Sequence, residues 1–128
     1  MNTVFLDRTS GNKLPQALKL LGLSIEAHAD HFPHNTPDEI WLAEVGARGW
    51  FVITNDKNIK INASERHALI NNGVGCFVLG AGGRTRFDQA RILVRAWDRM
   101  QSVMDSRSRP FICRIHADGH LDQLYPPT

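Results

Sequence analysis

Three aspartates that lie far apart in the sequence are the strongest candidates for catalysis. Asp7 ends a short apolar run, Asp38 opens a helical pattern, and Asp56 lies two residues after the apolar run 50–54. Carboxylates that meet in one place raise one another's pKa unless a cation neutralises them, and their oxygens suit Mg²⁺ or Mn²⁺. Such an ion in an open cleft holds phosphate oxygens and activates a water for in-line attack. The aspartates therefore predict a metal-dependent phosphodiesterase centre if the fold unites them.

The hydrophobic pattern shows which elements must position these residues. Strand-like patterns alternate with helical ones. We expect strands over residues 3–7, 23–29, 50–54, 75–79, 111–116 and 121–124, and helices over about 14–22, 36–49, 63–72 and 86–105. This alternation predicts an α/β fold with a mainly parallel sheet, and Asp118-Gly119 predicts a C-terminal β-hairpin. No long linker divides the chain, so residues 1–128 are expected to form one domain.

The predicted topology brings the aspartates to one edge of the sheet. In a doubly wound sheet, ligands bind beyond the carboxyl ends of the strands, near the point where the strand order reverses. Asp7 and Asp56 each follow a strand, and Asp38 opens the helix that leads into the second of these strands. A helix that returns antiparallel to its strand begins near the carboxyl edge. We therefore expect all three carboxylates to meet there.

Each aspartate also has a purely structural interpretation. Asp7 and Asp56 are typical turn residues, and a carboxylate such as Asp38 is favoured in the first turn of a helix by the helix dipole. Thr36 is expected to cap that helix, with Pro37 in its first turn and Glu39 completing a capping box. The three acids together are stronger evidence for a functional site than any one of them alone.

Several other features favour structural roles. The apolar stripe of the long helix, which includes Phe87, Val94 and Trp97, is expected to face the core. His28, His31 and His34 recur at every third position, and we interpret them as ordinary loop histidines because a loop lacks a helical face to aim them at a metal.

Composition narrows the class of protein without naming a partner. The chain has 128 residues, of which 42% are hydrophobic and 22% charged, and this excludes a predominantly disordered chain. Fifteen basic and thirteen acidic residues give a net charge of +2, which neither demands nor forbids a nucleic-acid partner. No apolar run approaches the ~20 residues of a membrane span, and the first residues do not read as a secretory signal. We expect a cytoplasmic protein with reduced cysteines and no membrane partner.

Three segments together resemble the PIN-domain nucleases, in particular the short PIN-like proteins related to VapC-type toxins. The segments are Phe5–Gly11, Thr36–Trp41 and Gly49–Lys57. Within the last, Thr54-x-Asp56 is similar to the family's Thr-x-Asp turn. Asp38 is similar to the acid that opens the preceding helix in that family.

The resemblance implies a fold and an activity. The expected fold is a three-layer α/β/α, Rossmann-like sandwich, and the expected activity is that of a metal-dependent endoribonuclease, often the toxin of a type II toxin–antitoxin pair. The expected partners are RNA and a cognate antitoxin, and homodimers are common in the family. Asp7, Asp38 and Asp56 would hold Mg²⁺ or Mn²⁺. Arg8, Thr54 and Lys57 would contact the RNA or orient the site.

The sequence departs from the larger PIN domains in one respect. Those domains place another acid, usually Glu, between the positions matched by Asp7 and Asp38, whereas Glu26 here lies in an expected strand. The site is therefore expected to hold one metal ion rather than two, or to use Glu39 or Glu65 as a further acid.

Two alternative functions stay open. The missing acid also fits a degenerate PIN-like module that binds RNA or a protein without cutting. A phosphoacceptor receiver domain fits the length and the acidic edge, but such a domain has paired acids after its first strand and a lysine after its last parallel strand. This sequence has neither feature, so we rank that alternative last.

Overall fold

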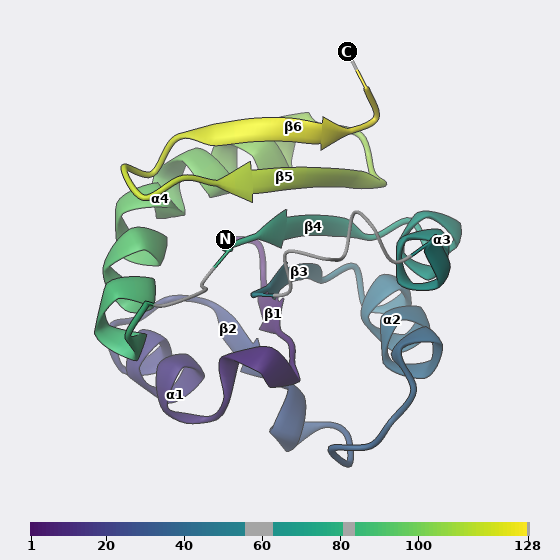
Figure 1. Ribbon diagram of the computed structural model, residues 1–128, viewed down its shortest axis with the longest axis horizontal. Coiled ribbons are helices and arrows are strands. Elements are labelled where there is room, and N and C mark those ends of the chain that lie inside the picture. The colour runs from purple at the N-terminus through teal and green to yellow at the C-terminus, as the bar shows by residue number, and fades with distance from the viewer. Residues whose placement is uncertain (56–62, 81–83, 128) are drawn as a thin grey trace.

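The computed structural model describes residues 1–55, 63–80 and 84–127. Within these ranges, ten helices and strands follow one another in the alternating order that the sequence predicts (Figure 1). They are β1 (Val4–Leu6), α1 (Lys13–Leu20), β2 (Ile25–Ala27), α2 (Asp38–Ala47), β3 (Phe51–Thr54), α3 (Ala63–Asn71), β4 (Gly75–Val78), α4 (Arg86–Ser106), β5 (Phe111–Ile115) and β6 (Leu121–Tyr125). Two short 3₁₀ turns, η1 (Arg8–Ser10) and η2 (His28–Asp30), follow β1 and β2.

The strands form one six-stranded sheet in the order β2-β1-β3-β4-β5-β6. The first five strands are parallel, and β6 returns antiparallel to β5, which confirms the predicted C-terminal hairpin. After β2 the chain crosses to the other side of β1, so the strand order reverses between β1 and β3. The backbone N–H of Asp7 donates to the carbonyl of Ile53 at 3.1 Å, which joins the carboxyl ends of these two strands.

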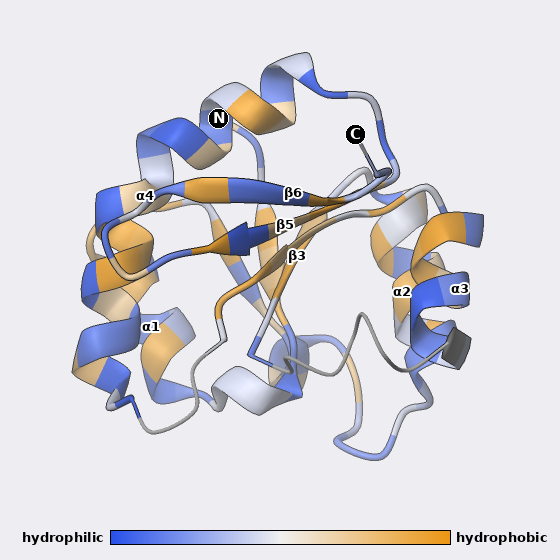
Figure 2. Cartoon of the chain, turned by 45° about the horizontal axis from the view of Figure 1, so that its top comes forward, coloured by the Kyte–Doolittle hydropathy of each residue, from blue (hydrophilic) through white to orange (hydrophobic). Residues whose placement is uncertain are grey.

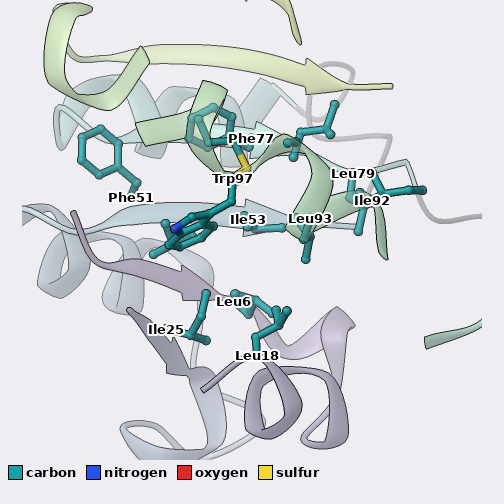
Figure 3. Close-up of a cluster of buried hydrophobic side chains, with 14 of the residues drawn as sticks. Leu6, Leu18, Ile25, Phe51, Ile53, Phe77, Leu79, Ile92, Leu93 and Trp97 are labelled. Carbon is teal, nitrogen blue, oxygen red and sulfur yellow. The ribbon is translucent and has the colours of Figure 1, made fainter. Parts of the chain in front are cut away.

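Helices cover both faces of the sheet, which confirms the α/β/α sandwich. Helices α1 and α4 lie on one side, and α2 and α3 lie on the other (Figure 1). The first side buries a core that includes Leu18, Leu93 and Trp97 (Figure 3). The second side buries Phe5 and Trp41. The central strand β3 is largely hydrophobic and buried along its whole length because both its faces are covered (Figure 2).

Two residues of the predicted apolar stripe on α4 do not face the core. Phe87 is 74% exposed and Val94 is 46% exposed, so their expected burial is wrong. The line of α4 that meets the sheet runs through Leu93, Trp97 and Met100, all of them buried. At about 100° per residue, Phe87 and Val94 lie roughly a third of a turn away from that line. The face of α4 that packs against the sheet is therefore narrower than the apolar stripe predicted from the sequence.

The two cysteines agree with the expectation from the sequence. Cys76 and Cys113 are free thiols buried in neighbouring strands, as predicted. Among the described residues, no helix combines the length and apolar character needed to traverse a lipid bilayer.

Candidate active site

Asp7 lies directly after β1 and caps the turn η1. Its Oδ1 accepts hydrogen bonds from the backbone N–H of Thr9, at 3.1 Å, and from the Thr9 hydroxyl. The side chain of Thr54, at the end of β3, also hydrogen-bonds to this carboxyl group. Asp7 is only 4% exposed. The neighbouring strands β1 and β3 and the turn after β1 therefore fix the position of this carboxylate.

Burial and a neighbouring negative charge both disfavour the ionised form of Asp7. Burial raises the pKa of the Asp7 carboxyl above its ordinary value of 3.8 because desolvation penalises the charged form. The hydrogen bonds from Thr54 and Thr9 oppose this shift, and the negative charge of Asp38 adds to it. A cation bound beside Asp7 would relieve both the desolvation and the repulsion.

Asp38 is the first residue of α2, but the helix does not begin as predicted. Pro37 occupies the cap position, and no side chain caps the helix there. Thr36 instead donates its hydroxyl to the carbonyl of Pro33 at 2.8 Å, and its backbone N–H donates to the same carbonyl. The predicted Thr36 cap and Glu39 capping box are therefore wrong, because a turn preceding the helix already engages Thr36.

Arg8 and Trp41 hold the Asp38 carboxylate by one oxygen. The Asp38 Oδ1 atom accepts a hydrogen bond from Trp41 Nε1 at 2.9 Å and lies 3.3 Å from an Arg8 guanidinium nitrogen. Arg8 also donates to the carbonyls of His34 and Thr36, at 3.3 Å and 3.0 Å. The second oxygen, Oδ2, accepts no hydrogen bond from a described residue. Arg8 thus ties the turn after β1 to the segment before α2.

The structure brings together four of the six residues predicted from the sequence. Asp7, Thr54, Arg8 and Asp38 form a connected group at the carboxyl edge of β1 and β3. The other two, Asp56 and Lys57, lie outside the described residues. Within the described ranges, no group of three or more His, Cys, Asp or Glu side chains is arranged to hold a metal ion.

The other acids considered from the sequence differ in their surroundings. Glu26 pairs with Lys19 and His31, at 3.5 Å and 3.1 Å, and belongs to β2 rather than to the acidic edge. Glu39 is exposed. Glu65 is buried in α3, and its charge, like that of Asp7, raises the pKa of the Cys76 thiol further after desolvation.

Thr9 is a site residue that the sequence analysis missed. Its hydroxyl accepts a hydrogen bond from the backbone N–H of Asn55 at 3.1 Å while donating to Asp7. The backbone carbonyl of Thr9 accepts hydrogen bonds from both terminal guanidinium nitrogens of Arg86, at the start of α4, each at 3.4 Å. The Asp-x-Thr pattern is a local turn signal that the sequence offered. The contact with Arg86 spans 77 residues and has no sequence signal.

We expect Thr9→Val to raise the pKa of Asp7 still further, because it removes a donor to the ionised carboxylate. It should also lower the free energy of unfolding by about 1 kcal/mol, the usual value of such a hydrogen bond. Thr9→Ser keeps the hydroxyl and serves as the matched control. The measurement is the titration of the Asp7 carboxyl carbon by NMR in both variants. An Asp7 pKa that is unchanged in Thr9→Val would contradict the orienting role of Thr9.

The three regularly spaced histidines do not share one environment. His28 lies in η2 and is 3% exposed, so its interpretation as an ordinary loop residue is wrong. His28 directly follows β2, and its ring packs against those of Phe5, Phe32 and Trp41 on the side of the sheet that α2 and α3 cover. His31 bonds to Glu26, whereas His34 is exposed.

The fold and this site define a Rossmann-like α/β/α protein with paired carboxylates at the switch point of its sheet. A family model described as "PIN like domain" matches residues 2–81, and the chain belongs to this family. The matched region contains both Asp7 and Asp38. This membership sets aside the receiver-domain alternative.

Two searches of known proteins give further context. The chain is 28% identical over 82 residues to a Mycobacterium tuberculosis protein named "Putative ribonuclease VapC45". The alignment covers 60% of this chain and 59% of that protein. This chain therefore spans less than two thirds of the curated relative. No solved structure matches the chain significantly.

Proposed function

We propose that the chain is a Mg²⁺- or Mn²⁺-dependent endoribonuclease that hydrolyses phosphodiester bonds in RNA. The observation that carries the proposal is the buried Asp7 carboxylate, whose pKa is raised by desolvation and by the nearby charge of Asp38. Membership of the PIN-like family supports it, as does the name of the mycobacterial relative.

The described donors fit a hard divalent cation. Mg²⁺ is commonly bound through one or two carboxylates, with waters and substrate phosphates completing its ligands. Asp7 and Asp38 provide two carboxylates that repel each other, and Asp38 Oδ2 has no partner among the described residues. The chemistry that such an ion supplies when bound is positive charge beside phosphate oxygens and a lowered pKa for water.

Each proposed residue has a distinct role in this assignment. Asp7 and Asp38 bind the cation together with Asp56. Thr54 orients the Asp7 carboxylate through its hydrogen bond. Arg8 and Lys57 steady the RNA backbone, with Arg8 also fixing Asp38. Single-stranded or loop RNA is the expected substrate, because exposed, unpaired nucleotides can enter a protein site.

We also propose the biological setting that the relative's name supports. The chain would act as a single domain and as the toxin of a toxin–antitoxin pair, with a cognate antitoxin covering it in the cytoplasm. A homodimer fits this setting. A pull-down of the antitoxin encoded beside this gene, followed by measurement of the complex mass, tests both expectations.

Removal of the metal should abolish RNA cleavage. We expect the purified chain to cut a labelled single-stranded RNA in Mg²⁺ or Mn²⁺ and to lose at least about 100-fold of this rate in EDTA, because metal assistance is worth several kcal/mol. Excess Mn²⁺ should restore cleavage. The measurement is product formation on a denaturing gel. Cleavage that continues unchanged in EDTA would contradict the proposal.

One observation favours the non-cutting alternative. The Arg8 guanidinium already provides a positive charge beside Asp38, which would suit a site that does not need a metal. In that case the chain would bind RNA without cutting it, and Mg²⁺ or Mn²⁺ would leave its melting temperature unchanged.

A further inference from the structure

The positive charge of the protein is concentrated in α4 and the residues just before it. Residues 84–99 contain five of the fifteen basic residues and two of the thirteen acidic ones, so this segment has a net charge of +3. The rest of the chain has ten basic and eleven acidic residues and a net charge of −1. Basic residues clustered along one helix attract polyanions such as nucleic acid. The small net charge of the whole chain therefore conceals one strongly basic helix.

Three of these arginines continue a line that starts at an exposed phenylalanine. At four-residue spacing, α4 presents the exposed side chains of Phe87, Arg91, Arg95 and Arg99, which we call the α4 line. Residues four apart are neighbours on the surface of a helix. At 1.5 Å per residue, the line is about 18 Å long. The Arg91 guanidinium lies 5.9 Å from the centre of the Phe87 ring, so the aromatic end and the basic part are continuous.

The α4 line begins beside the proposed catalytic edge. Arg86, the first residue of α4, donates two hydrogen bonds to the backbone carbonyl of Thr9. The Thr9 hydroxyl in turn donates to the Asp7 carboxylate. Phe87 thus follows directly after a residue that contacts the turn holding Asp7. An RNA strand with one phosphate at the acidic edge can therefore continue onto the α4 line.

The internal contacts of the arginines leave their guanidinium groups available to a ligand. Arg91 pairs with Asp88 at 3.2 Å, but both side chains are more than one third exposed, and ion pairs between exposed groups are weak. Arg95 donates from one nitrogen to the carbonyl of Ala117 at 3.4 Å. Each guanidinium has five N–H donors, and its planar shape allows two of them to bind one phosphate.

The composition of this surface favours single-stranded RNA over an acidic protein. The cores of protein–protein interfaces are depleted of charged residues. In α4 the exposed large apolar side chains are Phe87 and Val94, and Arg91 lies between them in the sequence while Arg95 follows directly. Proteins that bind single-stranded nucleic acid instead combine a basic track for the backbone with aromatic rings on which bases stack. The Phe87 ring, 74% exposed, is such a ring.

We infer that the α4 line binds the single-stranded RNA on one side of the cleaved phosphodiester bond. Phe87 would stack on a base close to the site, and the three arginines would bind the phosphates that follow. The inference rests on the proposed function and identifies where the chain holds the rest of its substrate. Contacts of this kind give affinity and position the strand, but they do not read its sequence.

A double variant, Arg91→Gln with Arg99→Gln, tests the basic part of the line. Arg95 is left in place because it also holds the Ala117 carbonyl. The measurement is the affinity for a short single-stranded RNA in EDTA, by fluorescence anisotropy at several salt concentrations. We expect an affinity loss of at least about tenfold. The plot of log affinity against log salt should become shallower by about 1.4, because each phosphate contact on a single strand contributes about 0.7.

The matched control is Arg48→Gln with Arg114→Gln, which removes the same charge from exposed positions away from α4. Arg48 follows α2. Arg114 points to the face of the sheet opposite α4, since Cys113 beside it packs in the core that α4 covers. The control should keep the salt dependence of the unmodified chain. The same change in salt dependence in both double variants would overturn the inference, because it would report net charge rather than the α4 line.

The Phe87→Leu variant tests stacking on a base. Leucine keeps an apolar side chain but has no ring, and the melting temperature should not fall because Phe87 is exposed. We expect an approximately tenfold loss of affinity for the RNA, whereas Phe87→Tyr should bind as the unmodified chain does. On an abasic strand of the same length, Phe87→Leu and the unmodified chain should bind equally. Equal binding of the complete RNA by these two proteins would overturn the inference, and so would an equal loss on the abasic strand.

Competition and cleavage separate the inference from its alternatives. Polyglutamate of matched length should not displace the RNA, and displacement as effective as that by unlabelled RNA would overturn the inference and indicate a surface for acidic proteins. If both variants of the α4 line bind RNA normally while the unmodified chain cleaves it in Mn²⁺, the α4 line fails and the proposed function stands. RNA binding that depends on the α4 line, without any cleavage, gives the reverse result.

Discussion

The Asp7→Asn variant is expected to lose metal-stimulated RNA cleavage by about 100- to 1,000-fold, equivalent to about 3–4 kcal/mol. The amide oxygen of asparagine can still accept the hydrogen bonds that Thr9 donates to Asp7. The substitution therefore removes one negative charge and leaves the turn intact. The measurement is the rate of RNA cleavage in Mn²⁺ under single-turnover conditions.

The same variant should be more stable than the unmodified chain when no metal is present. Because the folded-state pKa of Asp7 is raised, its contribution to stability is present below the ordinary value of 3.8 and is lost as the pH rises through the folded-state pKa. Asparagine carries no such cost. The melting temperature of Asp7→Asn should therefore exceed that of the unmodified chain at neutral pH, and the two should converge near pH 3.

A surface variant separates the effect of the site from that of lost charge. Asp98 is exposed on α4, so Asp98→Asn makes the same chemical change away from the sheet edge. It should retain full cleavage, and its melting temperature should not show the pH-dependent gain. Addition of Mn²⁺ should raise the melting temperature of Asp98→Asn but not of Asp7→Asn. Full cleavage by Asp7→Asn would refute the assignment of the metal site.

The largest loss of stability is expected from Gly75→Ala. A Cβ atom at Gly75 in β4 would lie 2.6 Å from atoms of both the Phe51 and Phe111 rings. Carbon atoms pack at about 3.5–4.0 Å, and both rings are fully buried. We expect the free energy of unfolding to fall by about 3 kcal/mol and the melting temperature by roughly 10 °C. Denaturant titration followed by circular dichroism measures the change.

A double-mutant cycle with Phe111→Leu tests the cause of this loss. Leucine removes part of the ring that the new methyl group would strike, so Gly75→Ala should cost less in the Phe111→Leu background. Equal costs in both backgrounds would show that the rings are not responsible. An alanine normally stabilises a strand relative to glycine by reducing the freedom of the unfolded chain. A stabilising effect of Gly75→Ala would therefore mean that Phe51 and Phe111 move aside readily.

The order and type of the elements are predictable from the sequence, but the face that a helix buries and the way it is capped are not. The pattern of apolar residues places α4 within one residue at its C-terminal end, because periodicity is a local property. The exposure of Phe87 and Val94 depends on how the helix is rotated against the sheet, which local periodicity does not determine. The sequence also predicts the helix α2, but with Thr36 as its cap, whereas Pro37 occupies the cap position and Asp38 is the first helical residue. Its Thr36 cap was wrong because the hydroxyl had a competing acceptor in the preceding turn.

The sequence by itself determined the alternating α/β order and the carboxylates at the ends of those elements. These features follow from hydrophobic periodicity and from the rule that parallel strands align their carboxyl ends. Only the tertiary structure decided that Asp7 is buried, that Arg8 joins Asp38, and that Phe87 is exposed beside the arginines of α4. Such properties depend on desolvation and on contacts between segments distant in the chain, and a linear pattern of residue types does not contain them.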